Sequence, residues 1–125
     1  MTQRQAEQFA RYWIEAWNDH NLDAVISHYA DNVVFTSPFV VVLLDDPSGT
    51  ISGRAALRAY FEKGLAAYPD LTFELLDVLA GVNSVTLYHR SVNGKLAAEV
   101  MAVDAQGMIA EVRAHYRDGD SVSGV

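Results

Sequence analysis

Hydrophobic residues near the start of the chain recur with helical spacing. Phe9, Trp13 and Trp17 follow one another at intervals of four, which places them on one face of an amphipathic helix. Thr2, followed three residues later by Gln5, fits a capping box at the start of that helix. The pattern therefore predicts a first helix that ends before the polar run after Trp17.

Two further helices and one strand are predicted before the middle of the chain. Asn21 can cap a short second helix. Residues 33–37 are β-branched and aromatic enough for a strand, and Pro38, which cannot donate to a sheet ladder, closes it. A third helix opens at Ser52-Gly53 and ends near Pro69.

The second half of the chain has the texture of an antiparallel sheet. Strand-like runs at 72–79, 85–92, 95–103 and 108–117 are separated by turn residues. Asn93-Gly94 is a strong hairpin signal, because both residues tolerate the positive φ of a type I′ turn. Helices first and a sheet afterwards predict the α+β class.

The hairpin turn fixes which side chains share a face of the sheet. With Asn93 and Gly94 as the two turn residues, Tyr88 faces Glu99 and Arg90 faces Ala97. One face then carries Thr86, Tyr88, Arg90, Ala97, Glu99, Met101 and Val103. The other carries Val85, Leu87, His89, Leu96, Ala98, Val100 and Ala102. Both faces are substantially apolar, so we expect one to meet the helices and the other a second subunit.

Composition narrows the class of protein. At 125 residues, with 50% hydrophobic and 20% charged residues, the chain fits one domain, 1–125. The absence of cysteine excludes disulfides and thiolate chemistry. A net charge of -7 disfavours a nucleic-acid partner. No apolar stretch is long enough to span a membrane and no signal peptide is evident, so we expect a cytoplasmic location.

Three segments carry a resemblance to a known family. They are WIEAWNDHNLD at 13–23, YADNVVFTSP at 29–38 and GRAALRAYF at 53–61. Their order resembles the nuclear transport factor 2-like superfamily, in its SnoaL-like and ketosteroid-isomerase-like branch. The resemblance implies a cone-shaped α+β barrel, in which about three N-terminal helices pack on a curved, antiparallel or mixed sheet. It also implies a pocket on the concave side and a homodimer through the convex side.

The same resemblance places individual residues. Glu99 falls where ketosteroid-isomerase-like proteins have an oxyanion-hole carboxylic acid, so its face points into the pocket. The position of the family's general base is Ser37 here, and the position of its oxyanion tyrosine is Trp13, whose indole can donate a hydrogen bond but cannot exchange a proton. Ketosteroid isomerisation by the family mechanism is therefore not expected.

Glu99, with Arg90 and Tyr88, forms the candidate catalytic group. A carboxyl in an apolar pocket has a raised pKa, which suits an acid or base near neutrality. An ion pair with Arg90 would instead keep the carboxylate charged and structural. A third reading gives Glu99 the role of orienting a ligand. Tyr88 can donate a hydrogen bond to a ligand oxygen or simply fill the sheet face.

The residues expected to bind substrate come from helices and strands alike. They are Trp13, Trp17, Phe35, Ser37, Tyr60, Met101, Val112, Ala114 and Tyr116. Aromatic walls with a few polar groups imply a small apolar or cyclic ligand. No phosphate-binding loop indicates a nucleotide cofactor, and the four histidines lack metal-ligand spacing, so no cofactor is expected.

The apolar run at 39–44 stands where the resemblance calls for a loop. Six apolar residues in a row do not stay in water without a reason. The run can be an extra short strand or a segment packed on the core or on a partner subunit. It can also be a lid over the pocket mouth, with residues 45–49 as its exposed turn.

Two functions from different classes fit these observations. The first is a cofactor-independent isomerase, cyclase, dehydratase or hydrolase in which Glu99 moves a proton. The second is a non-catalytic module that binds a ligand in the same cavity or serves dimerisation. The fold alone does not choose between them, because one scaffold hosts many functions.

Overall fold

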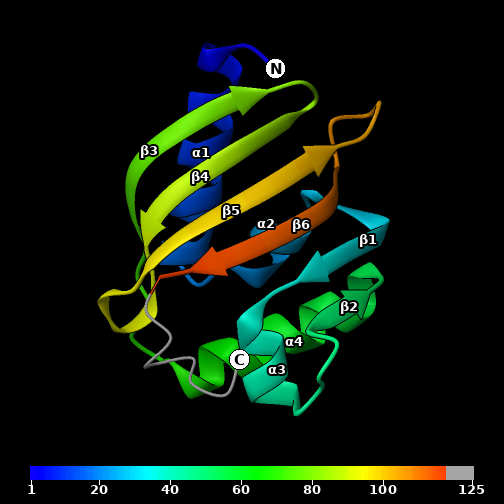
Figure 1. The fold of residues 1–125 in the computed structure, drawn as a ribbon, viewed down its shortest axis with the longest axis vertical. Coiled ribbons are helices and arrows are strands. Elements are labelled where there is room, and N and C mark those ends of the chain that lie inside the picture. Colours follow the sequence, from blue (N-terminus) through cyan, green and yellow to red (C-terminus); the bar gives the residue numbers. More distant parts are fainter. Residues whose placement is uncertain (118–125) are drawn as a thin grey trace.

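The protein, described by a computed structural model over residues 1–117, confirms the α+β class. The four α-helices lie before residue 68, and the four long strands of the antiparallel part of the sheet follow after residue 73 (Figure 1). The elements are α1 (Gln3–Asn18), α2 (Leu22–Ile26), β1 (Tyr29–Thr36), α3 (Pro38–Leu44), β2 (Thr50–Ser52), α4 (Arg54–Ala67), β3 (Glu74–Gly81), β4 (Ser84–Arg90), the short 3₁₀ helix η1 (Val92–Gly94), β5 (Leu96–Val103) and β6 (Ile109–Tyr116).

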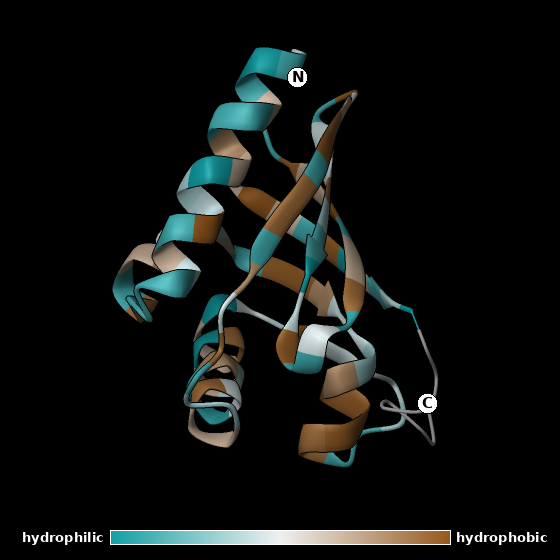
Figure 2. Ribbon diagram, turned by 90° about the vertical axis from the view of Figure 1, so that its left-hand side faces the viewer, coloured by the Kyte–Doolittle hydropathy of each residue, from teal (hydrophilic) through white to brown (hydrophobic). Residues whose placement is uncertain are grey.

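The strands form one mixed six-stranded sheet in the order β2-β1-β6-β5-β4-β3. The β1–β6 pair is parallel and the other pairs are antiparallel. Helix α1 lies along one side of the sheet, against β3, and α4 packs on β1 (Figures 1 and 2). Helix α3 closes one end, next to β6. The hydrophobic core lies between these helices and the inner face of the sheet.

The first helix has the start and the buried face that the sequence predicts. The Thr2 hydroxyl accepts a hydrogen bond from the Gln5 amide at 3.1 Å, and the Thr2 amide donates to the Gln5 side chain at 2.8 Å. This reciprocal capping box satisfies backbone donors that a helix N-terminus otherwise leaves free. Trp13 and Trp17 are buried on the face turned to the sheet.

The apolar run at 39–44 is a helix, and the prediction of an extra strand is wrong. Ser37 ends the extended segment and caps α3, because its hydroxyl accepts a hydrogen bond from the Phe39 amide at 3.2 Å. Pro38 occupies the first helical turn, where its fixed φ is favourable and its missing N–H is not needed. Phe39 and Val40 are buried. The segment therefore packs on the core, and its role as a lid stays a prediction.

The β4–β5 hairpin corrects the predicted register by one residue. Asn93 and Gly94 adopt the expected positive φ of 56° and 73°, but they belong to a five-residue connection that contains η1 rather than a two-residue turn. Leu87 consequently pairs with Glu99, and Tyr88 pairs with Ala98. A shift of one residue turns every side chain of a strand to the other face.

This register reverses the predicted faces of β4 and keeps those of β5 and β6. Val85, Leu87 and His89 point into the core with Ala97, Glu99 and Met101, and Thr86, Tyr88 and Arg90 point outward. Val112 and Ala114 on β6 are buried, as expected. Val85 and Leu87 are therefore buried in the core and are not part of the outer face that the sequence analysis assigned to a second subunit.

The helices that the structure describes include none that is both long and apolar enough to cross a lipid bilayer. The cytoplasmic location expected from the sequence stays a prediction.

Gly49 holds the turn that returns the chain from α3 to the sheet, and we expect Gly49→Ala to lower stability by about 1–3 kcal/mol. Its φ is +63°, and an added Cβ would lie 3.2 Å from the Ser37 carbonyl oxygen and 3.1 Å from Val41 Cγ2. Gly64→Ala is the matched control. It lies within α4 with open space around its Cβ, so it should stabilise by up to about 1 kcal/mol. Urea unfolding of both variants measures the two effects, and equal midpoints would refute this account.

Candidate functional site

An aromatic cavity of about 70 Å³ lies between α1, α4, α3 and the sheet. Its walls are rings from all of these elements, and the largest lie almost out of solvent. The aromatic residues that line it are Trp13, Trp17, Tyr29, Phe35, Phe39, Tyr60, Phe61, Tyr68, Phe73 and Tyr116. A cavity with such walls suits an apolar or cyclic ligand.

The rings are held in place by one another. Trp13 stacks on Phe73 with centroids 5.3 Å apart, and Trp17 meets the edge of Phe61 at 4.7 Å. Phe39 of α3 meets the edge of Tyr116 at 4.8 Å. Each such pair contributes about 0.5–1.5 kcal/mol beyond the area it buries. The cavity walls are therefore part of the hydrophobic core.

A wider groove of about 430 Å³ adjoins the cavity at the surface. The groove runs between the segment after α4 and the β4–β5 connection, and both spaces are bordered by Tyr68, Leu71, Ser91 and Val92. These four residues form the boundary between them. A ligand too large for the cavity can extend across this boundary into the groove.

Glu99 brings a carboxylate to the cavity from the middle of β5. It is 5% exposed, and its neighbours across the sheet are Leu87 and Ala114. The cavity is lined by Glu99 together with five residues that the sequence assigned to substrate binding: Trp13, Trp17, Phe35, Tyr60 and Tyr116. The remaining four, Ser37, Met101, Val112 and Ala114, are buried close by without lining it.

Arg90 and Tyr88 lie on the opposite face of the sheet from Glu99, because of the corrected register. Arg90 Nε lies 3.5 Å from a Glu74 carboxylate oxygen, and Arg90 Nη1 donates to the Gly94 carbonyl at 3.1 Å. Tyr88 is 38% exposed. The Arg90–Glu99 ion pair, one of the alternatives that the sequence left open, is therefore absent among the described residues, and Glu99, Arg90 and Tyr88 do not come together as one group.

His89, which the sequence placed outside, is the residue that meets Glu99. Its side chain is completely buried, and its Nε2 lies 3.3 Å from Glu99 Oε1 without hydrogen-bond geometry. The sequence carried a signal for this placement. Val85 and Leu87, the most apolar residues of β4, alternate with His89 on one face, which is the pattern of a strand whose inner side is buried.

Three of the four tyrosines that line the cavity are neutral hydrogen-bonding groups with a raised pKa. Tyr29, which the sequence analysis left out of the site, accepts a hydrogen bond from Trp13 Nε1 at 3.2 Å. Burial raises the pKa of Tyr29, Tyr60 and Tyr116, and the nearby Glu99 carboxylate raises it further. Hydrogen bonding with Ser37 lowers the pKa of Tyr60 by less than burial raises it. These phenols keep their protons at physiological pH.

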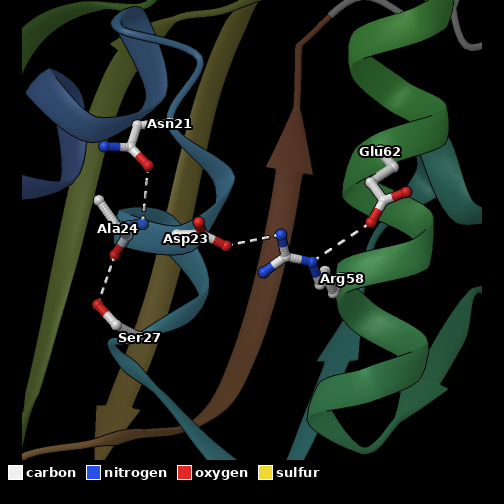
Figure 3. A network of polar contacts seen from close by, with 6 residues as sticks. All are labelled: Asn21, Asp23, Ala24, Ser27, Arg58 and Glu62. Carbon is white, nitrogen blue, oxygen red and sulfur yellow. Dashed lines mark hydrogen bonds and ion pairs between the residues drawn. The ribbon is translucent and has the colours of Figure 1, made fainter.

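A polar network outside the cavity joins α2 to α4 (Figure 3). Arg58 donates to Asp23 at 2.7 Å and to Glu62 at 3.3 Å. Because these side chains are exposed to water and salt, the ion pairs add little to the stability of the fold. Within residues 1–117 no cluster of three or more acidic or histidine side chains could hold a metal ion.

The three buried tyrosines make stability fall in alkali. The unfolded phenols lose their protons near pH 10, whereas the folded ones hold them to higher pH. The unfolded state therefore binds fewer protons above pH 10, and each tyrosine removes about 1.4 kcal/mol of stability per pH unit there. Tyrosinate absorbance recorded with circular dichroism should show these three ionising only as the fold is lost. Ionisation of all six tyrosines in the folded protein would contradict this.

Comparison with known proteins agrees with this geometry. The family model of the SnoaL-like domain matches residues 10–123 of this chain. The crystal structure of a SnoaL-like protein of unknown function from Burkholderia thailandensis superposes with a TM-score of 0.90 at 43% identity, over 94% of this chain and 98% of that one. A search of the curated proteins finds no match.

More distant structures share the fold. An NTF2-like protein of unknown function from Cytophaga hutchinsonii gives a TM-score of 0.70 at 18% identity, over 98% of this chain and 95% of that one. SalBIII, an epoxide hydrolase/cyclase-like enzyme in pyran ring formation in salinomycin, gives 0.72 at 19% identity, over 94% of each chain. The family match and the Burkholderia protein together decide the assignment: this chain belongs to the family of SnoaL-like domains.

Proposed function

We propose that this protein is a cofactor-independent enzyme that moves a proton within a small apolar or cyclic substrate, with Glu99 as the acid or base. An isomerase, cyclase, dehydratase or hydrolase would each use such a step. The observation that carries the proposal is the carboxylate of Glu99 among the aromatic walls of the cavity. The cation expected to neutralise it, Arg90, is bound to Glu74 on the outer face instead.

The substrate class follows from the walls. Aromatic rings bind an apolar ring system, and the neutral hydroxyls of Tyr60 and Tyr116 suit one or two polar oxygens. The cavity of about 70 Å³ is smaller than the roughly 300–1,000 Å³ of most ligand pockets. We therefore expect a single small ring inside, with any extension lying in the adjoining groove.

The chemistry is general acid–base catalysis. Glu99 would take a proton from a carbon beside a carbonyl group and return it to another position, which contributes roughly 10²–10⁴-fold to a rate. A tyrosine hydroxyl at the cavity would donate a hydrogen bond to the oxyanion that forms. Neither Ser37 nor Trp13 takes part, because Ser37 caps α3 and Trp13 donates to Tyr29.

Cyclohexanone provides a test of proton transfer that needs no knowledge of the natural substrate. We expect the protein to accelerate exchange of its α-protons in D₂O, followed by NMR, and Glu99→Gln to lose at least about 100-fold of that acceleration. Glu62→Gln, which removes an exposed carboxylate on α4 that lines neither the cavity nor the groove, is the matched control. Equal exchange rates in the wild type and Glu99→Gln would refute the catalytic role.

Binding is measured separately by intrinsic fluorescence. Both tryptophans of the chain line the cavity, so cyclohexanone bound there should quench their emission. Quenching in the wild type without accelerated exchange would favour the non-catalytic alternative, in which the same cavity only binds its ligand.

We also propose a homodimer through the outer face of the sheet. Leu79, Tyr88 and Val100 are exposed there, and Glu111 and Arg113 lie beside them on β6. A two-fold axis lets the acidic residue of one copy meet the basic residue of the other, which makes the face self-complementary. The partner we infer is therefore a second copy of this chain.

Sedimentation velocity at micromolar concentration tests the dimer. We expect the mass of two chains for the wild type and of one chain for Val100→Asp, which places a charge in the middle of the apolar face. Val82→Asp is the control, because Val82 is 90% exposed at the β3–β4 turn and should leave the mass unchanged. A wild-type protein that sediments as a single chain would exclude this interface.

A further inference from the structure

We propose that His89 is a positioning residue for Glu99 and that the two side chains share one proton. The catalytic consequence rests on the proposed function, whereas the shared proton is a property of the folded chain alone. The two can therefore be tested apart.

His89 and Glu99 are in contact in a buried place where other polar partners are scarce. His89 Nε2 and Glu99 Oε1 are 3.3 Å apart, and their side chains are 0% and 6% exposed. Neither ring nitrogen of His89 has a hydrogen-bond partner among the described residues. A buried polar nitrogen without a partner costs stability, and a charge that is mostly withdrawn from water costs more unless it is paired. A single proton held between them gives Nε2 and the carboxylate a partner in each other.

Aromatic rings fix the imidazole from two sides. Trp13 lies 5.3 Å away in an edge arrangement, and the centroid of Phe73 lies 4.9 Å from that of His89. Electron-rich ring faces stabilise a neighbouring cation, so this enclosure suits a protonated imidazole. The ring does not line the cavity itself, and His89 therefore acts on a substrate only through Glu99.

The other titratable groups around Glu99 are phenols. Tyr29 on β1, Tyr60 on α4 and Tyr116 on β6 have a raised pKa and stay neutral, and Tyr68 also lines the cavity. Among residues 1–117, His89 is the side chain that forms an ion pair with Glu99. Because these phenols stay neutral near pH 7, the group that can exchange a proton with Glu99 in that range is His89.

A shared proton gives Glu99 the form that a base requires. With one proton on the pair, the imidazolium balances the carboxylate and the net charge in the cavity is zero. When Glu99 removes a substrate proton, the C–H electron pair forms a C=C bond, the C=O π pair moves to the oxygen, and the His89–Glu99 pair becomes cationic beside that oxyanion. Return of the proton to another carbon restores the starting state. The distance of 3.3 Å exceeds that of a charge-assisted hydrogen bond, so sharing the proton requires Glu99 to turn toward His89 and proton abstraction requires it to turn toward the cavity.

Nitrogen-15 NMR of the histidine rings tests the pair without any substrate. At pH 7 we expect His89 to show the signature of an imidazolium in the wild type and of a neutral ring in Glu99→Gln. His115, exposed on β6, is the internal control and should be the same in both. The proposal would be overturned if His89 were neutral in the wild type, or if its protonation state were the same in the wild type and in Glu99→Gln.

The pH dependence of cyclohexanone exchange tests the catalytic consequence. In His89→Gln, which keeps a polar side chain but holds no charge, we expect the acidic limb of the profile to move to higher pH by roughly 1–3 units, the effect of losing an adjacent opposite charge. His89→Phe, which preserves an aromatic ring between Trp13 and Phe73, should show the same movement. If these variants exchange cyclohexanone more slowly but the acidic limb of the pH profile does not move, His89 has a structural role only and the positioning role is overturned. Absence of exchange in the wild type would refute the proposed function, while the ring-nitrogen spectra still decide the pair.

Discussion

The hydrogen bond from the Ser91 amide to the Lys95 carbonyl, at 2.6 Å, closes the β4–β5 connection and sets the register of the sheet around the cavity. That register pairs Leu87 with Glu99 and turns His89 inward. A connection shorter or longer by one residue would put Arg90 and Tyr88 in the cavity and expose His89, since side chains alternate along a strand. The chemistry available to the cavity therefore depends on the geometry of one short connection.

The sequence predicts the helices and the fold class because their signals are local. The spacing of Trp13 and Trp17 and the Thr2–Gln5 capping box act within a few residues, and both are confirmed. Ser37-Pro38 is ambiguous, since the same pair ends a strand and starts a helix. The unbroken apolar run after it has no periodicity that distinguishes a helix from a strand, so the helix at 38–44 was not predicted.

The candidate site was predictable only in part, because strand parity magnifies small errors. The positive φ of Asn93 and Gly94 follows from their residue types, but two residues do not determine the length of the whole connection. An error of one residue there leaves Glu99 in place and replaces His89 by Arg90 as its partner. The contact of His89 with Glu99 depends on the register between β4 and β5, which the turn residues alone do not determine.

Stability does not account for a histidine in contact with a carboxylate in this aromatic core. Replacing a buried ion pair with apolar side chains of similar volume is often neutral or stabilising, and Trp13 and Phe73 would pack well against such a replacement. By contrast, Ser37 and Trp13 have structural partners that explain them, as the cap of α3 and the donor to Tyr29. The two positions that serve catalysis in ketosteroid-isomerase-like relatives thus support the fold here, and the group whose burial costs stability lies across the cavity on β4 and β5.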